Sequence, residues 1–113
     1  MRSVACLVVM LLCCSPWVRA AQSMPPTVVI GSKNFTESVV LGEIARLTAR
    51  EDGLQAQHRR SLGGTRILWR ALREGDIDVY AEYTGTLTHE LLHDVAPRAG
   101  IKVLRERLAR YGI

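Results

Sequence analysis

Apolar and polar positions alternate along the chain in a way that predicts strands and helices in turn. Residues 27–30 form a short β-branched run that Gly31 ends, which is typical of a buried strand. Apolar residues then recur at steps of four and three, at Val40, Ile44 and Leu47. This spacing predicts an amphipathic helix over residues 35–50, with Asn34 as its cap. Residues 54–61 alternate more weakly and predict a second strand.

The second half continues the same alternation. Thr65 follows two glycines and is expected to cap a helix that Gly75 ends in a left-handed conformation. Residues 77–82 predict a third strand, and a helix of about ten residues should follow it and end before Pro97. A last amphipathic helix is predicted from apolar residues spaced by three, four and three, namely Ile101, Leu104, Leu108 and Tyr111.

The order of these elements predicts an α/β fold with a short, mostly parallel sheet and right-handed crossovers. Ligands of such sheets bind beyond the carboxyl ends of the strands. Three turns that contain glycine and a hydroxyl residue would meet at that rim, at 31–34, 62–65 and 83–86. Each opens a helix, whose free N–H groups attract anions. Turns of this kind also simply cap helices, so their pattern alone leaves a binding rim and ordinary capping both open.

The N-terminus has the layout of a cleaved secretory signal peptide. Arg2 precedes an unbroken apolar run of eleven residues at 4–14, and small or apolar residues flank a cleavage point after Ala20. Eleven helical residues span about 16 Å, which is too short for the ~30 Å hydrocarbon core of a bilayer. We therefore expect a signal peptide at 1–20, a linker at 21–26 and a periplasmic location. A lipid-attachment signal at the end of the run is the alternative.

Composition narrows the function classes. The chain has 113 residues, with 15 basic against 11 acidic side chains and three cysteines. Loss of residues 1–20 removes two arginines and every cysteine, which leaves no disulfide and no cysteine-based metal site. The length fits one domain. Basic residues form no run longer than Arg59-Arg60, so nucleic-acid binding is not expected.

Three motifs stand at the predicted turns: IGSKNFTE at 30–37, LGGT at 62–65 and GDIDVYAEYTGT at 75–86. Together they resemble the substrate-binding proteins of ABC importers for quaternary amines such as glycine betaine, choline and carnitine. The resemblance covers residues 27–113. It implies part of lobe one of a type II periplasmic-binding-protein fold, in which two lobes close on the ligand. The second lobe is missing from this sequence, so we expect a truncated substrate-binding domain that works with an ABC permease.

The resemblance also implies the site residues. A trimethylammonium group has no N–H to donate, so aromatic ring faces hold it, at ~0.5–2 kcal/mol each. Tyr83 matches a cage tyrosine, Thr86 a residue that bonds the ligand's carboxylate, and Lys33 a lysine near that carboxylate. Ser38 stands where several relatives have glutamine, which puts a contact there in doubt. The resemblance implies no catalysis and no cofactor.

Trp69 and Tyr80 are the other aromatic residues near these motifs. We expect both to pack in the interior rather than to contact ligand.

Two variants of the functional assignment stay open. The truncated chain is a remnant that binds nothing, or it is one half of a split protein whose companion chain supplies the second lobe.

A rival motif at 89–93 predicts different chemistry. His89, Glu90 and His93 form an H-E-x-x-H pattern, which on a helix brings two histidines to one zinc ion and a glutamate to its water. This would make the chain a small secreted zinc hydrolase. A third ligand is required, and Glu106, on another predicted helix, has no specific support. Two polar histidines on a surface helix explain the pattern as well.

Overall fold

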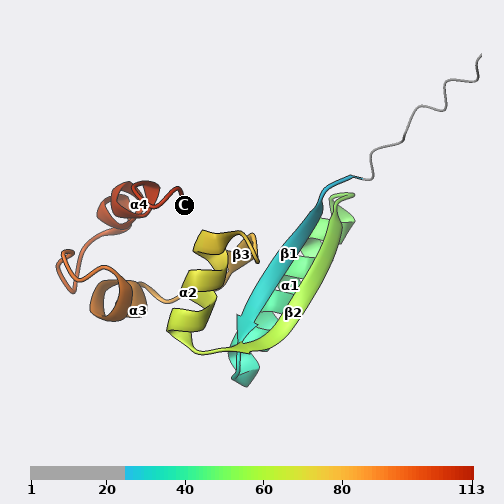
Figure 1. Cartoon of the computed structure of the whole chain (residues 1–113), viewed down its shortest axis with the longest axis horizontal. Helices are drawn as coiled ribbons and strands as arrows, with labels where there is room; N and C mark the ends of the chain where they lie inside the picture. The colour runs from blue at the N-terminus through green and yellow to red at the C-terminus, as the bar shows by residue number, and fades with distance from the viewer. Residues whose placement is uncertain (1–24) are drawn as a thin grey trace, which may run out of the picture.

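The computed structural model describes residues 25–113; the predicted signal peptide and residues 21–24 of the predicted linker lie outside them. Strands and helices alternate as predicted (Figure 1). The elements, in chain order, are β1 (Thr27–Lys33), α1 (Thr36–Glu51), β2 (Gln55–Gly63), α2 (Thr65–Glu74), β3 (Val79–Tyr80), α3 (Thr84–Thr86), the π-helical turn η1 (Leu87–Leu91) and α4 (Ile101–Ala109). None of the helices within 25–113 is long and apolar enough to cross a membrane.

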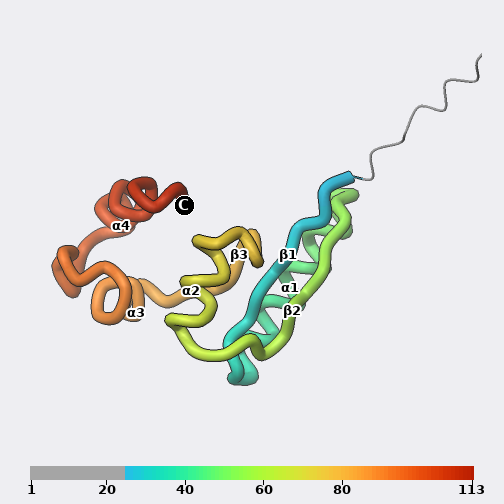
Figure 2. The backbone as a smooth tube through the Cα atoms, in the orientation of Figure 1, coloured from blue at the N-terminus to red at the C-terminus, as the bar shows by residue number. Residues whose placement is uncertain are grey.

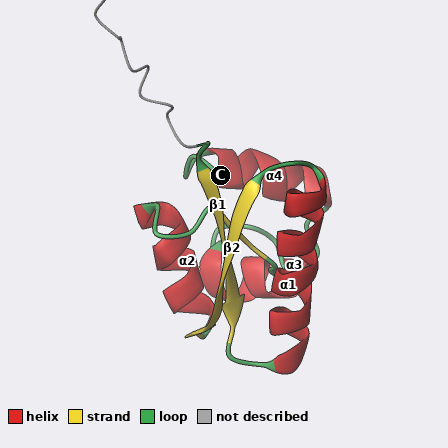
Figure 3. Ribbon diagram, turned by 90° about the vertical axis from the view of Figure 1, so that its right-hand side faces the viewer, coloured by secondary structure: helices red, strands yellow, loops and turns green. Residues whose placement is uncertain are grey.

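The three strands form one parallel sheet in the order β2-β1-β3, so β1 is central and the other two strands are its edges. Ile30 of β1 pairs with His58 of β2 on one side and with Val79 of β3 on the other. The crossover from β1 to β2 and the crossover from β2 to β3 run in opposite directions across the sheet, and right-handed connections then place α1 and α2 on opposite faces (Figure 3). The predicted α/β fold, a partial lobe with a short parallel sheet flanked by helices, is confirmed.

The third strand is shorter than the predicted 77–82. The backbone N–H groups of Asp76 and Ile77 donate to the carbonyl of Ala71, at 2.8 and 3.3 Å, and so complete the end of α2. Pairing with β1 begins only at Asp78, whose N–H donates to the Val29 carbonyl at 2.7 Å. The Asp78 carboxylate in turn accepts the Val29 N–H at 2.6 Å. The end of the helix therefore takes up Ile77, the first residue of the predicted strand.

Helix α1 packs on the sheet through small residues, and not through its apolar stripe. Ser38 and Gly42 are buried, whereas Val40, Ile44 and Leu47 are 50%, 54% and 48% exposed. The reason is close approach: a Cβ on Gly42 would lie 2.4 Å from Nε2 of His58 in β2. The helix itself is correctly predicted, but its packed face is not.

Both predicted side-chain caps are wrong. Phe35 is the N-cap of α1 and Gly64 that of α2, and neither makes a side-chain capping bond. Thr65 is instead the first residue of α2. The left-handed glycine after that helix is confirmed, because Gly75 has φ of 81°.

Two apolar clusters hold the chain together. On the sheet, Leu68 and Ile77 are fully buried against Gly31, where a Cβ would lie 2.6 Å from an Ile77 methyl group. The second cluster lies beyond α2, at the end of the molecule away from β2 (Figure 2). It contains Leu92, Val95 and Leu104, with Trp69, Leu87, Leu91, Ala99 and Leu108 packed around them. Trp69 also meets the ring of Tyr111 edge to face at 5.4 Å, so its predicted packing role is confirmed.

Candidate functional site

The three predicted turns meet at the carboxyl ends of the strands. Lys33 ends β1, Thr65 opens α2, and Glu82 follows β3. The Lys33 Nζ lies 2.5 Å from Glu82 Oε1 and 3.1 Å from Thr65 Oγ1. The first two turns also bond directly, since the Asn34 N–H donates to the Gly63 carbonyl at 3.1 Å. The sheet thus brings the three motifs to one rim.

Lys33 and Glu82 form a buried ion pair. Their side chains are 5% and 7% exposed, so each charge has lost most of its water and depends on the other for compensation. An ammonium has three N–H donors. Glu82 and Thr65 take two, which leaves one without a partner among residues 25–113. Lys33 is therefore a fixed, neutralised cation and not a mobile loop lysine.

Tyr83 lies beside this pair at the surface. Its backbone N–H donates to Glu82 Oε1 at 3.0 Å, and its ring centroid lies 5.8 Å from the Lys33 Nζ. The side chain remains 40% exposed, so part of the ring is accessible. Hydrogen bonding with Glu37 of α1, followed by burial, raises the pKa of the Tyr83 phenol. Thr86 is half-buried three residues further on, one helical turn from Tyr83.

Glu82 is the site residue that the sequence reasoning missed. Its carboxylate accepts hydrogen bonds from Lys33 of β1 and from the Tyr83 N–H at the start of α3, and Lys33 in turn donates to Thr65 of α2. Tyr80 of β3 lies next to it, and burial, with the Glu82 charge adding to it, raises the pKa of the Tyr80 phenol. Tyr80 is half-buried, which agrees with its predicted packing role. An acid two residues past a strand, at the edge where a lysine also ends a strand, was the available signal.

A second polar cluster ties the other face of the sheet to α1. His58 of β2 places Nε2 2.9 Å from the Ser32 Oγ and Nδ1 3.0 Å from Glu43 Oε2. The order of hydroxyl, imidazole and carboxylate is that of a hydrolase triad. However, Ser32 is fully buried and its Oγ accepts the Ser61 N–H at 3.2 Å. No substrate reaches this oxygen, so the cluster is a structural connection.

Glu43 is the charged end of that cluster. Hydrogen bonds from Arg46, then from His58 and Arg60, lower its pKa to about 2. The carboxylate therefore stays ionised throughout the neutral and mildly acidic range. It gives the buried imidazole a fixed negative partner on the α1 side.

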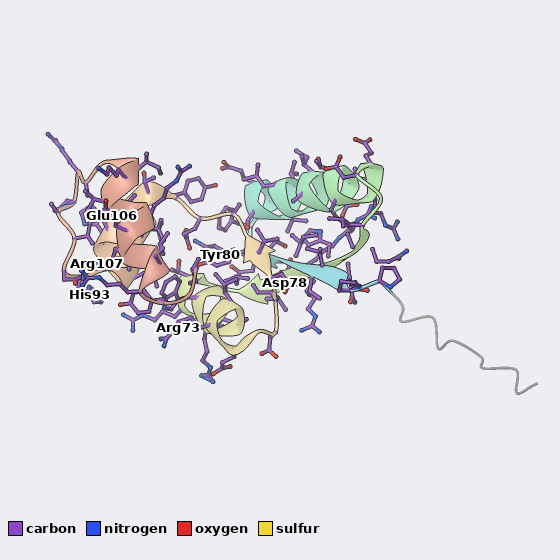
Figure 4. The ribbon with its side chains drawn as sticks, turned by 90° about the horizontal axis from the view of Figure 1, so that it is seen from above. Arg73, Asp78, Tyr80, His93, Glu106 and Arg107 are labelled. Carbon is purple, nitrogen blue, oxygen red and sulfur yellow. The ribbon has the colours of Figure 1, made fainter. Side chains whose placement is uncertain are left out.

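The H-E-x-x-H motif does not have the geometry of a zinc site. The π-helical turn ends at Leu91, so His93 lies outside the helix that would set it one turn from His89. Both histidines are exposed. Within residues 25–113 no three His, Cys, Asp or Glu side chains gather closely enough to hold a metal ion. His93 also lies on the α4 side of the molecule, away from Tyr80 and β3 (Figure 4).

Comparison with known proteins agrees with the three motifs at the rim. Over 70 residues the chain is 36% identical to the glycine betaine-binding protein YehZ of Escherichia coli (strain K12). The aligned stretch covers 58% of this chain and 23% of that protein. The match thus spans about a quarter of the relative's length. Residues 26–110 match the family OpuAC, described as the substrate binding domain of ABC-type glycine betaine transport systems. The chain belongs to this family of substrate-binding proteins, as its motifs predicted.

Proposed function

We propose that the chain supplies one wall of an extracytoplasmic binding site for quaternary-ammonium osmoprotectants, which an ABC permease then imports. The observation that carries the proposal is the half-exposed ring of Tyr83 beside Lys33, at the carboxyl edge of the parallel sheet. Membership of a glycine betaine-binding family supports it. The predicted signal peptide at 1–20 would direct the chain out of the cytoplasm.

The chemistry of the rim suits a zwitterion. The accessible face of Tyr83 attracts a methylated cation, because the ring quadrupole is negative on that face. The unused N–H of Lys33 and the hydroxyl of Thr86 would donate hydrogen bonds to the ligand's carboxylate. Choline has no carboxylate and would use only the ring. The proposal therefore ranks glycine betaine and carnitine above choline for this wall.

The isolated chain is expected to bind weakly. One ring contributes ~0.5–2 kcal/mol and a charge-assisted hydrogen bond ~1.5–3 kcal/mol. Association costs roughly 4–15 kcal/mol in lost freedom, and a 1 mM dissociation constant corresponds to about −4.1 kcal/mol. We expect millimolar affinity or weaker by calorimetry with glycine betaine. Micromolar affinity from this chain alone would contradict the single-wall account.

Exposed apolar surface supports a companion that completes the site. Val40, Ile44 and Leu47 form a continuous stripe on α1 that nothing within residues 25–113 covers, and the strands β2 and β3 are open edges. A partner that adds strands and covers this stripe would remove both features. We propose a polypeptide equivalent to the unmatched three quarters of the relative, encoded next to this chain.

Two measurements test the companion. The DNA that follows the codon of Ile113 should encode, in this or another frame, the remainder of the family domain. The two products mixed in equal amounts should form a 1:1 complex by size-exclusion chromatography with light scattering, and should then bind glycine betaine in the micromolar range. An unrelated downstream sequence, or two products that stay separate, would leave the chain as a non-binding remnant.

A further inference from the structure

Two buried polar atoms behind the rim have no hydrogen-bond partner among residues 25–113. They are the phenolic oxygen of Tyr80 and Oε2 of Glu82. The chain runs without a turn from β3 to Tyr83, and in extended backbone two residues that are two positions apart project from the same face. Tyr80 and Glu82 also line one cavity. A donor without an acceptor and an acceptor without a donor are therefore neighbours.

The wall of this cavity offers little else to either atom. The cavity has a volume of about 190 Å³. Besides Tyr80 and Glu82, its lining consists of Trp69, Leu72, Leu87, Leu108 and Ile113. The only other side-chain donor among them is the indole N–H of Trp69, whose ring packs edge to face on Tyr111. A carboxylate oxygen that has lost its water in apolar surroundings is unfavourable until a donor replaces that water.

The other oxygen of the same carboxylate is already bound on the rim side. Glu82 Oε1 lies 2.5 Å from Lys33 Nζ and accepts the Tyr83 N–H at 3.0 Å. A glutamate carboxylate turns readily about its last bond, so a donor fixed at Oε2 keeps Oε1 directed at the rim. The Tyr80 phenol responds to this carboxylate, because burial, followed by the charge of Glu82 and hydrogen bonding with it, raises the phenol's pKa. The phenol is therefore close enough to be that donor.

We propose that Tyr80 is a positioning residue for the rim: its phenol donates a hydrogen bond to Glu82 Oε2 and so holds Oε1 against the Lys33 ammonium. Lys33 then keeps two N–H groups on Glu82 and Thr65, and its third N–H stays directed at the rim. The inference rests on the proposed function only for its consequence, a lysine that is set in place for a ligand's carboxylate. The hydrogen bond and the order of Lys33 are both measured without ligand.

The first measurement detects the hydrogen bond itself by ¹H NMR of the chain. A buried hydroxyl proton that is bonded to a carboxylate should give a separate downfield signal that exchanges slowly with water. This signal should disappear in Tyr80→Phe and remain in Tyr111→Phe, the matched control at a phenol that is 40% exposed. No such signal in the parent chain would overturn the proposal. A signal that persists in Tyr80→Phe would also overturn it, because Trp69 or another group would then be the donor.

The second measurement follows Lys33 in the chain labelled with ¹⁵N-lysine. Lys33 and Lys102 are the only lysines in the sequence, and the exposed Lys102 is the internal control. In Tyr80→Phe the Lys33 ammonium should exchange its protons with water roughly threefold to tenfold faster, as expected from the loss of one hydrogen bond. Leu108→Ala enlarges the same cavity and removes no hydrogen bond, so the Lys33 exchange should not change. Equal effects in the two variants, or no effect in Tyr80→Phe, would leave Tyr80 with a packing role only and overturn the proposal.

The third measurement links the positioning role to the ligand. In NMR titrations, Tyr80→Phe should weaken the binding of glycine betaine by a similar factor and leave that of choline unchanged, because choline has no carboxylate for Lys33. Equal weakening for the two ligands would contradict a role through Lys33. If the parent chain bound neither ligand, the proposed function would fail, whereas the hydroxyl signal and the Lys33 exchange would still decide the role of Tyr80.

Discussion

Replacement of Lys33 by methionine removes the cation that neutralises Glu82 and keeps a side chain of similar length. Both side chains are more than nine-tenths buried, and the two atoms are 2.5 Å apart. Removal of one partner of such a pair costs about 3–5 kcal/mol, because the other charge is left buried alone. A domain of 89 described residues has a free energy of unfolding of about 4–13 kcal/mol at 0.05–0.15 kcal/mol per residue. Lys33→Met should therefore lose about 3–5 kcal/mol of that free energy of unfolding, which unfolds the chain at 25 °C if the parent lies at the low end of the range.

The second substitution, Glu82→Gln, should rescue the first. The double variant has no buried charge, and the glutamine oxygen still accepts the Tyr83 N–H, so we expect stability within about 1 kcal/mol of the parent. Urea unfolding is followed by the fluorescence of Trp69, the only tryptophan once residues 1–20 are removed. Lys102→Met, at an exposed position, should change stability by no more than about 0.5 kcal/mol. A loss below about 1 kcal/mol for Lys33→Met, or no rescue by Glu82→Gln, would refute the buried pair.

Three further predictions concern stability. Gly42→Ala should lower the free energy of unfolding in urea by up to about 2 kcal/mol, because overpacking against His58 (~1–3 kcal/mol) outweighs the gain from helix propensity (~1 kcal/mol). Gly85→Ala, whose new methyl group meets open space, should not destabilise. The raised Tyr80 pKa contributes stability that is present below pH 10 and lost as pH rises beyond it. Between pH 9 and 11, Tyr80→Phe should therefore lose less stability than the parent chain. An equal loss in the two proteins would contradict this. The lowered Glu43 pKa contributes stability that is present above pH 4.5 and lost as pH falls toward 2. Glu43→Gln should therefore flatten the acid-unfolding curve, measured by circular dichroism over that range. An unchanged curve would contradict the role of Glu43 in the cluster with His58.

The order of elements could be predicted because each one has a local signal. Alternation of β-branched runs with glycine-bounded helices was enough to predict a parallel sheet, and Gly75 has the left-handed conformation expected of it. The motifs at the rim were also sufficient to identify the family. These features depend on residues close together in the sequence.

The errors came from contacts between distant residues. The spacing of Val40, Ile44 and Leu47 identifies a helix, but only the closeness of Gly42 to His58, sixteen residues apart, decides which face packs. Thr65 is a residue type that often caps helices, yet its hydroxyl accepts a hydrogen bond from the ammonium of Lys33 in β1.

The pairing of Lys33 with Glu82 follows the same rule, since 49 residues separate the two along the chain. Only the parallel register of β1 with β3 brings these strand ends together. Roles for Lys33, Tyr83 and Thr86 toward a ligand stay predictions.

The most direct test of the binding wall is a titration of the ¹⁵N-labelled chain with glycine betaine, followed by amide and tyrosine ring shifts in NMR. The account predicts saturable shifts at millimolar concentrations that centre on Tyr83, Thr86 and Lys33, that are smaller with choline, and that vanish in Tyr83→Ala. Shifts that centre on His89 and His93, or no shift at Tyr83 at any concentration, would contradict it.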